Sequence, residues 1–299
     1  MVYTVTFNPA IDYVVRLDKL NEGKTNRTRG EQIYCGGKGI NVSAVLAELG
    51  VKSAALGFTA GFTGKAIGEM VKSMGINADF TELKEGCSRI NVKIKSEEET
   101  EINAQGPKIT DSDINRLCER LDGISDGDFL VLAGSIPPSL PDDIYEKILA
   151  GLRGKKIKAA VDATNKLLLN VLKYKPFLVK PNESELGEMF GTELKTKDEI
   201  IFYAKRLKEM GAVNVLVSMA EKGAVLIDER GEVHSCGACR GVVQNSVGAG
   251  DSMVAGFIAG LEKGDYGYAL KLGTAAGGAT AFSEGLAKRK DIFELMKQL

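Results

Sequence analysis

The chain has 299 residues, of which 44% are hydrophobic and 26% are charged, a composition typical of a globular protein with room for one large α/β core. Its formal net charge of -1 gives no global electrostatic reason to bind nucleic acid or an anionic membrane. The N-terminal segment lacks the features of a signal peptide, and no apolar run reaches the ~20 residues that span a bilayer. We therefore expect a cytoplasmic protein with small-molecule ligands.

Short apolar segments alternate with helical patterns through most of the chain. The sequence predicts strands at residues 2–8, 53–58, 128–135, 157–163, 176–182 and 213–219. It predicts helices at residues 40–49, 64–74, 111–122, 142–153, 183–190 and 196–210, and an almost wholly helical part from Ala249 onward. This alternation is typical of an α/β fold with a mostly parallel sheet and helices on both faces.

Two segments depart from the alternation. Residues 10–34 are polar and extended, and residues 88–105 alternate in the manner of a hairpin. The chain contains no internal repeat and no low-complexity linker. We therefore predict a single domain over residues 1–299, in which the two segments form a small β-sheet lid.

The cysteines and the histidine offer little chemistry. The five cysteines are odd in number and widely spread, which argues against a disulfide framework. Cys236 and Cys239 follow closely after His234, the only histidine, but a structural zinc site would need a second ligand pair. We interpret both cysteines as ordinary loop thiols and expect His234 to lie in a solvated polar loop.

The most informative motif, Asn-Ser-Val-Gly-Ala-Gly-Asp at residues 245–251, leads directly into a helical pattern. Gly248 and Gly250 let backbone amides approach an anion without an intervening Cβ, and the helix N-terminus adds unpaired N–H donors. Asp251 follows at once, where a carboxylate can accept a proton from an attacking hydroxyl. The motif indicates an anion hole beside a general base, with a plain helix cap as the alternative.

A second glycine-rich turn, at residues 36–41, also opens a helix. It places Lys38 among the glycines and Asn41 in the first helical turn, where an amide can hydrogen-bond hydroxyls. Its spacing fits neither the Walker A loop nor the G-x-G-x-x-G motif, which argues against a P-loop enzyme and a dinucleotide-binding oxidoreductase. A simple strand-to-helix turn is the alternative.

A third cluster begins at Lys180, after an apolar strand and therefore at the edge where open α/β sheets bind ligands. Asn182 and Glu185 are three residues apart at a helix start, so both side chains can face one point. Their oxygens suit Mg²⁺ held through its water molecules. The alternative is a capping box formed by the same two residues.

The three clusters, in this order and spacing, resemble the phosphofructokinase-B group of the ribokinase-like superfamily. The resemblance covers the whole chain and rests mainly on GGKGINVSAVLAELG at residues 36–50 and NSVGAGDSMVAGF at residues 245–257. It implies a ribokinase-like α/β fold, ATP and Mg²⁺ as cofactors, and phosphorylation of a small sugar phosphate. Members of the group often dimerise through the exposed lid, so a homodimer is expected.

Matched position by position, the resemblance implies roles for individual residues. Asp251 would be the base in an anion hole of Gly248, Ala249 and Gly250. The sugar phosphate would be bound by Asp12, Lys24, Gly36, Gly37, Lys38, Gly39, Asn41, Arg89, Asn103 and Ser135. Within that set, Lys38 and Arg89 would pair with the phosphate, assisted by Lys24 or Arg27. The nucleotide would be bound by Lys180, Asn182, Ser218, Gly223, Ala279, Ser283 and Gly285, and Mg²⁺ by Asn182 and Glu185.

The resemblance also bears on the acceptor. Residues 7–12, 36–41, 88–93 and 99–103 most resemble the branch that phosphorylates fructose 1-phosphate at its C6 hydroxyl. Fructose-6-phosphate kinases of the group tend to carry arginine near positions 26 and 101, where this chain has Asn26 and Glu101. Tagatose 6-phosphate and fructose 6-phosphate stay open as alternatives. A regulator that keeps the fold without catalysis is a distant alternative, against which the intact Asp251 argues.

Overall fold

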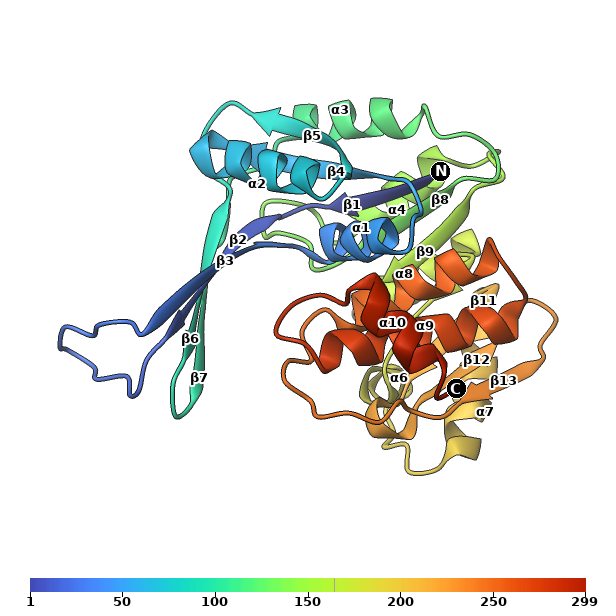
Figure 1. Cartoon of the computed structure of the whole chain (residues 1–299). Coiled ribbons are helices and arrows are strands. Elements are labelled where there is room, and N and C mark those ends of the chain that lie inside the picture. The colour runs from blue at the N-terminus through green and yellow to red at the C-terminus, as the bar shows by residue number, and fades with distance from the viewer. Residues whose placement is uncertain (164) are drawn as a thin grey trace.

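The computed structural model describes residues 1–163 and 165–299. Over these residues the chain forms a nine-stranded sheet in the order β13-β12-β11-β10-β9-β8-β1-β4-β5 and a four-stranded sheet in the order β3-β2-β6-β7. The large sheet lies between two layers of helices, and the small sheet projects from one end of the molecule (Figure 1). The predicted α/β architecture, with a mostly parallel sheet and a small additional one, is confirmed.

The large sheet is parallel except at one edge. Its strands are β1 (Val2–Thr6), β4 (Ser53–Ala60), β5 (Asn77–Leu83), β8 (Phe129–Ala133), β9 (Lys158–Asp162), β10 (Leu178–Val179), β11 (Asn214–Ser218), β12 (Ala224–Ile227) and β13 (Val233–Cys236). From β5 to β11 all neighbours are parallel, whereas β12 and β13 add an antiparallel edge. The sequence patterns missed β5, β12 and β13. Strands β5 and β13 lie at the edges of the sheet and expose several positions, and β12 is only four residues long.

His234 lies in this antiparallel edge and not in a loop, which corrects the expectation above. Its Nε2 lies 3.0 Å from Oδ2 of the buried Asp228, on the neighbouring turn. The structure contains no disulfide among its described residues, and Cys236 ends β13 as a buried free thiol.

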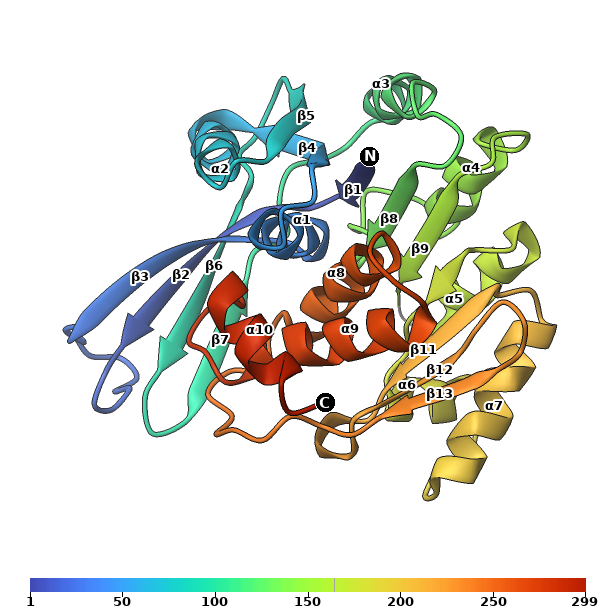
Figure 2. The same ribbon diagram turned by 45° about the vertical axis from the view of Figure 1, so that its right-hand side comes forward.

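Helices cover both faces of the large sheet (Figure 2). One face carries α1 (Lys38–Glu48), α2 (Gly61–Ser73), α8 (Ala249–Leu261), α9 (Tyr266–Ala281) and α10 (Arg289–Met296). The other carries α3 (Asp111–Leu121), α4 (Ile144–Gly151), α5 (Asn165–Val171), α6 (Glu183–Met189) and α7 (Lys197–Glu209). The part of the chain from Ala249 is helical, as predicted. No helix in the described part of the chain combines the length and apolar character needed to cross a lipid bilayer.

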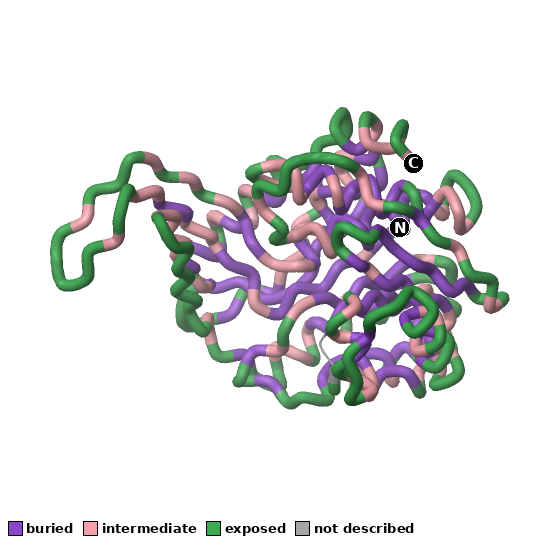
Figure 3. The backbone as a smooth tube through the Cα atoms, turned by 90° about the horizontal axis from the view of Figure 1, so that it is seen from below, coloured by how far each residue is buried: buried purple, intermediate pink, exposed green. Residues whose placement is uncertain are grey.

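Strand β8 shows why the central strands are apolar throughout. Val131 and Ala133 pack into the core beneath α8 and α9, whereas Leu130 and Leu132 pack into the core beneath α3 and α4. A parallel strand buried on both faces has no polar alternation to display. The buried strands accordingly run through the middle of the molecule, while the tips of the projecting sheet are exposed (Figure 3).

The projecting sheet consists of β2 (Ala10–Arg16), β3 (Gly30–Gly36), β6 (Arg89–Lys95) and β7 (Glu99–Asn103). The hairpin predicted within residues 88–105 is present as the antiparallel pair β6–β7, with its turn at residues 96–98. Strand β2 pairs antiparallel with β3 and parallel with β6, so two distant segments form one sheet. Because side chains alternate along a strand, one face is polar and the other is rich in isoleucine and valine.

Candidate active site

The site forms where the carboxyl ends of the central strands meet the N-terminus of α8. Asp162 ends β9, Lys180 follows β10, and Asp251 lies in the first turn of α8. Lys180 Nζ lies 3.5 Å from Asp162 Oδ1, and Lys38 Nζ, at the start of α1, lies 3.3 Å from Asp162 Oδ2. Parallel strands bring their carboxyl ends to one edge of a sheet, which is why residues so far apart in sequence converge here.

The sequence predicts Asp251 as the general base, and the surroundings of this residue suit that role. The residue is only 4% exposed, and Asn41 Nδ2 donates a hydrogen bond to its Oδ2 at 2.8 Å. Burial, and next the negative charge of Asp162, raise the pKa of Asp251 to about 6 against the opposing effects of Asn41, Lys38 and Lys180. A carboxyl group with a pKa of about 6 is ionised at neutral pH and is a stronger base than an ordinary aspartate.

Asp162 was missed in the sequence, where the signal was its position as a polar residue at the end of an apolar strand. Burial alone would raise the pKa of Asp162, but Lys180 and Lys38 outweigh burial and hold that pKa below its usual value. Burial likewise opposes protonation of Lys38, yet Asp162 and Asp251 keep the pKa of Lys38 above its usual value. The site therefore holds two cations, Lys38 and Lys180, close to the carboxylates of Asp162 and Asp251. The net charge of these four groups is nearly zero before any ligand binds.

The turn that precedes Asp251, which the sequence predicts to be an anion hole, carries glycines at positions 248 and 250. Gly248 caps α8 in the left-handed region at φ 81°, which strongly favours glycine. A Cβ on Gly250 would stand 3.1 Å from Lys180 Nζ, so this glycine keeps the space between the helix N-terminus and the lysine open. Lys180 Nζ thus lies beside the first turn of α8, where helix amides lack intrahelical partners, although the amide of Ala249 donates to the carbonyl oxygen of Ser246 at 3.2 Å.

Asp251 lies between two cavities. The first, of about 810 Å³, lies under the polar face of the projecting sheet and is lined by Asp12, Tyr34 and Asn41 among others. The second, of about 1170 Å³, is lined by α8 and α9 residues and includes Ala249 and Gly250. Since Asn41 lines the first cavity and bonds Asp251, while the turn before Asp251 lines the second, the carboxylate stands where the two meet.

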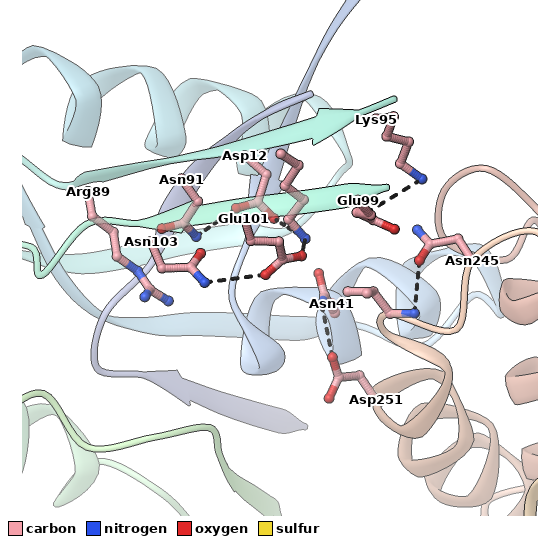
Figure 4. Close-up of polar contacts among 12 residues, drawn as sticks. Asp12, Asn41, Arg89, Asn91, Lys95, Glu99, Glu101, Asn103, Asn245 and Asp251 are labelled. Atoms are coloured by element: carbon pink, nitrogen blue, oxygen red, sulfur yellow. Dashed lines mark hydrogen bonds and ion pairs between the residues drawn. The ribbon is translucent and has the colours of Figure 1, made fainter. Parts of the chain in front are cut away.

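A polar network on the projecting sheet surrounds Asp12. Asn91 Nδ2 donates to Asp12 Oδ1 at 2.8 Å, and Lys93 Nζ lies 3.6 Å from Asp12 Oδ2 and 3.5 Å from Glu101 Oε1. A Cβ on Gly36 would approach Asp12 Oδ2 to 2.6 Å, so β3 can pass the carboxylate only with glycine there. These side chains point from the sheet toward Asn41 and Asp251 (Figure 4).

Two of the predicted sugar-phosphate residues, Asp12 and Asn41, line the first cavity. Gly36, Gly37, Lys38, Gly39 and Asn41 span the end of β3 and the start of α1. Ser135 is exposed just after β8, and its neighbour Gly134 lies against Lys38, with 3.8 Å between a Cβ built on Gly134 and Lys38 Cβ.

Arg89 and Asn103 belong to the polar face of the projecting sheet. Arg89 Nε donates to the carbonyl oxygen of Asn8 at 3.1 Å, and Asn103 Nδ2 donates to Glu101 Oε2 at 3.3 Å. Lys38 has different charged neighbours, Asp162 and Asp251, whereas Arg89 lies beside Asp12. The structure thus places Lys38 at the junction of the cavities and Arg89 under the projecting sheet.

Lys24 is not brought to the site of its own chain. It lies in the loop of residues 17–29 between β2 and β3, which extends away from the body of the molecule (Figure 1). It is exposed and is not among the residues that line either cavity.

The second cavity contains several of the predicted nucleotide residues, namely Asn182, Ser218 and Gly223. Asn182 and Glu185 form the capping box that was the alternative interpretation: Glu185 N donates to Asn182 Oδ1, and Asn182 N donates to Glu185 Oε2, both at 2.8 Å. The box leaves Glu185 Oε1 outside it, and a carboxylate oxygen of this kind is a type of ligand that suits Mg²⁺.

Ala279, Ser283 and Gly285, which were predicted to bind the nucleotide, are not among the residues that line the second cavity. Ala279 is buried in the core against α8, and Ser283 and Gly285 line the first cavity instead. The helix α9 ends at Ala281, and the chain then turns toward the projecting sheet, which carries the later residues to the other side. The residues of this region that line the second cavity are Gly277, Gly278, Ala281 and Phe282.

Comparisons with known proteins agree with this geometry. Residues 5–291 match the family model described as pfkB family carbohydrate kinase. The chain is 45% identical over 300 residues to the 1-phosphofructokinase of Bacillus subtilis, with 100% of this chain and 98% of that protein covered. It is 38% identical over 301 residues to the D-tagatose-1-phosphate kinase of Bacillus licheniformis, covering 100% and 98%.

A solved structure extends the similarity to three dimensions. The Escherichia coli phosphofructokinase-2 crystallised with substrates and products superimposes with a TM-score of 0.93 at 26% identity, covering 100% of this chain and 99% of that one. The match spans both sheets and the junction that holds Asp251, because it covers the whole chain. The chain therefore belongs to the pfkB family and is a carbohydrate kinase.

Proposed function

We propose that this enzyme transfers the γ-phosphoryl group of ATP to the C6 hydroxyl of fructose 1-phosphate, giving fructose 1,6-bisphosphate and ADP. The observation that carries the proposal is the position of Asp251, a buried carboxylate with a pKa of about 6 at the junction of two cavities. The cavity under the projecting sheet would hold the sugar phosphate, and the cavity along α8 and α9 would hold ATP. The name of the 45% identical relative supports the choice of acceptor.

In the proposed reaction Asp251 accepts the proton of the C6 hydroxyl as O6 attacks the γ-phosphorus. The O6–P bond forms, the bond from phosphorus to the β–γ bridging oxygen breaks, and ADP leaves with that electron pair. Asn41 holds Oδ2 of the carboxylate, so Oδ1 is the oxygen available to the hydroxyl. A positioned general base contributes roughly 10²–10⁴-fold to such a step.

Electrostatic stabilisation supplies the rest of the rate enhancement. The amides at the start of α8 and the ammonium groups of Lys180 and Lys38 surround the point where the transferred phosphoryl group would pass. We propose that Lys38 acts here and leaves the phosphate of the sugar to Arg89, because its charged neighbours are Asp162 and Asp251. Mg²⁺, when bound through Asn182 and Glu185, would supply further charge neutralisation of the ATP phosphates.

We also propose that the projecting sheet serves as a lid and as the interface of a homodimer. Its polar face covers the first cavity, whereas its opposite face exposes Ile33 (59%), Ile102 (58%) and Ile90 (39%). Residues paired in register lie on the same face, so Ile33 with Tyr13 and Ile102 with Val92 form one apolar surface. A sheet face of this composition favours burial against an identical face of a second copy.

A coupled ADP-release assay with MgATP tests the proposed reaction. Fructose 1-phosphate, fructose 6-phosphate and tagatose 6-phosphate are compared at equal concentrations, together with tagatose 1-phosphate because a 38% identical relative is named for it. We expect the highest kcat/KM with fructose 1-phosphate. A lead by a 6-phosphate would overturn the choice of acceptor, and absence of turnover with all four would favour a binding protein.

A further inference from the structure

The hairpin at the antiparallel edge of the large sheet brings together three side chains that can bind a metal ion. Asp228 follows β12, Glu232 precedes β13, and His234 lies within β13. The backbone N–H of Asp228 donates to the carbonyl oxygen of Glu232 at 3.0 Å, and His234 pairs in register with Leu226. Because side chains alternate along a strand, all three ligand side chains project from one face of the hairpin. One donor atom from each lies within 4.8 Å of the other two.

Asp228 is held in a fixed orientation within this group. The residue is only 1% exposed, and its Oδ1 accepts hydrogen bonds from the backbone N–H groups of Arg230 and Glu232, both at 2.9 Å. Its Oδ2 lies 3.0 Å from His234 Nε2. Two donor atoms that each lie about 2.0 Å from a tetrahedral metal ion are about 3.3 Å apart, so little movement would admit an ion between them.

A cavity of about 520 Å³ adjoins the hairpin and is lined by all three side chains. It leaves room for a water molecule as a fourth ligand. The other charged groups that line it are the carboxylates of Glu229 and Asp265 and the cations of Lys158 and Arg230. Four carboxylates thus face two cations, and a lining with net negative charge favours the entry of a cation.

The donor set and the location separate this group from the predicted Mg²⁺ site. An imidazole nitrogen with two carboxylates suits Zn²⁺ and similar transition metals, whereas Mg²⁺ prefers oxygen ligands alone. Leu261, which ends α8, lines this cavity, whereas Asp251 lies in the first turn of the same helix. At a rise of 1.5 Å per residue, the two ends are about 15 Å apart. The hairpin also lies at the edge of the large sheet away from the projecting sheet (Figure 2).

We propose that Asp228, Glu232 and His234 bind a divalent transition-metal ion of the Zn²⁺ type, with water as the fourth ligand. Nε2 of His234 ligates the ion in place of its contact with Asp228, and the proton of the neutral imidazole resides on Nδ1. The ion holds the two strands of the edge hairpin together. It stabilises the folded chain, because the unfolded chain does not keep the three ligands close to one another.

The test measures Zn²⁺ binding to the full chain, prepared without a histidine tag, by calorimetric titration in excess Mg²⁺. The variants are His234→Gln and Glu232→Gln, and the second changes an exposed side chain, so it leaves the core intact. Glu229→Gln is the matched control, because it makes the same change in the same turn and cavity, outside the three-residue group. Co²⁺ serves as a second probe, since thiolate ligands give it an intense near-ultraviolet band.

We expect one Zn²⁺ to bind per chain in the presence of excess Mg²⁺. His234→Gln and Glu232→Gln should each weaken binding by more than about 10-fold, at least as much as loss of an outer-shell partner. Glu229→Gln should weaken it by less than about 3-fold, because an exposed charge that does not ligate contributes weakly. His234 is the only histidine, so ¹H–¹⁵N spectra of its imidazole should show directly that Zn²⁺ shifts the Nε2 resonance.

Three results would overturn the inference. Absence of saturable binding by the wild type would mean that Asp228 and His234 form only a hydrogen bond. Equal weakening by Glu229→Gln and Glu232→Gln would mean that the cavity attracts cations without coordinating them. A thiolate band with Co²⁺, together with unchanged binding by His234→Gln, would move the ion to the cysteines. None of these results bears on the proposed reaction, because the readout is metal binding.

Discussion

Asn41 Nδ2 and Asp251 Oδ2 are 2.8 Å apart although 210 positions separate the two residues in the sequence. The bond joins the two glycine-rich motifs, since Asn41 lies in the first turn of α1 and Asp251 in the first turn of α8. It also links the two cavities, because Asn41 lines the first cavity and Ala249 and Gly250, at the start of α8, line the second. In the proposed reaction this hydrogen bond orients Asp251 toward the acceptor hydroxyl.

The substitution Asp251→Asn should lower kcat about 10²- to 10⁴-fold, the usual contribution of a general base. The KM values should change little, because the amide keeps the size of the carboxylate and its contact with α1. Steady-state kinetics with fructose 1-phosphate and MgATP measure both quantities, and Asp142→Asn, at an exposed position before α4, is the control. Retention of more than a tenth of the wild-type kcat would show that another group accepts the proton.

The pH dependence of kcat/KM, which reports the ionisations of the free enzyme, should show an acid limb at about pH 6. Asp251 acts as a base only when ionised, and its pKa is raised to about 6, so activity should fall as the pH drops through that value. The residual activity of Asp251→Asn should lack this limb. A wild-type limb near pH 4, where an ordinary aspartate titrates, would contradict the assignment.

The same pKa shift predicts an effect on stability. Because the folded protein holds the Asp251 proton more tightly than the unfolded chain, the wild type should lose stability as the pH rises from about 4 through 6. Asp251→Asn lacks this penalty and should be the more stable protein at neutral pH. Thermal unfolding of both proteins at pH 4 and pH 7 measures this effect. If the difference in Tm between Asp251→Asn and the wild type did not increase from pH 4 to pH 7, the prediction would be contradicted.

Removing the Asn41 amide should raise the pKa of Asp251 further, because the hydrogen bond from Asn41 stabilises the charged form. In Asn41→Leu the acid limb of kcat/KM should therefore shift above pH 6, together with a lower plateau from poorer orientation of the proposed base. The pH–rate profile separates the two effects. A lower plateau with an unmoved limb would mean that the amide only positions the substrate.

Asp162→Asn should destabilise the fold as well as the site. The substitution leaves Lys180, which is 5% exposed, as a buried cation without its carboxylate partner, a change that typically costs about 3–5 kcal/mol of unfolding free energy. The pKa of Asp162 lies below its usual value in the folded protein, so the ionised carboxylate stabilises the fold. The wild type loses this stabilisation as the pH falls below about 4.

Denaturant unfolding at pH 7 measures the cost of Asp162→Asn, and the double variant Asp162→Asn with Lys180→Met is the control. Removing both charges should restore much of the lost stability, because no buried ion then stands alone. If the two substitutions instead lowered the unfolding free energy additively, as independent substitutions do, the result would argue against a stabilising pair between Asp162 and Lys180.

Ile102→Lys should dissociate the proposed homodimer. The side chain is 58% exposed on the apolar face of the projecting sheet, and a lysine there would place like charges opposite each other in a symmetric interface. Light scattering coupled to size exclusion gives the mass of the wild type and the variant. Phe202→Lys, at a 55% exposed position on α7, is the matched control and should keep the wild-type mass. A monomeric wild type would contradict the proposal.

The sequence alone predicted the architecture, which the structure confirms, and it pointed to Asp251 as the candidate base. Strands that are buried on both faces, such as β8, are apolar throughout and so are easily recognised in the sequence. The turn before Asp251 is also easily recognised, because Gly248 adopts a left-handed conformation that strongly favours glycine. Both are local features, since each depends on neighbouring residues in the chain. Edge strands such as β13 were missed because their exposed positions impose no periodic pattern.

Only the tertiary structure decided which distant residues share a site. It paired Asp162 with Lys180 and Lys38, and it separated Ser283 from the nucleotide-side cavity. It also brought His234 to Asp228 through the pairing of β12 with β13, where the sequence patterns predicted a polar loop. Charge pairing, burial and pKa depend on distances in space, and these are set by strand order and helix packing rather than by the order of residues along the chain.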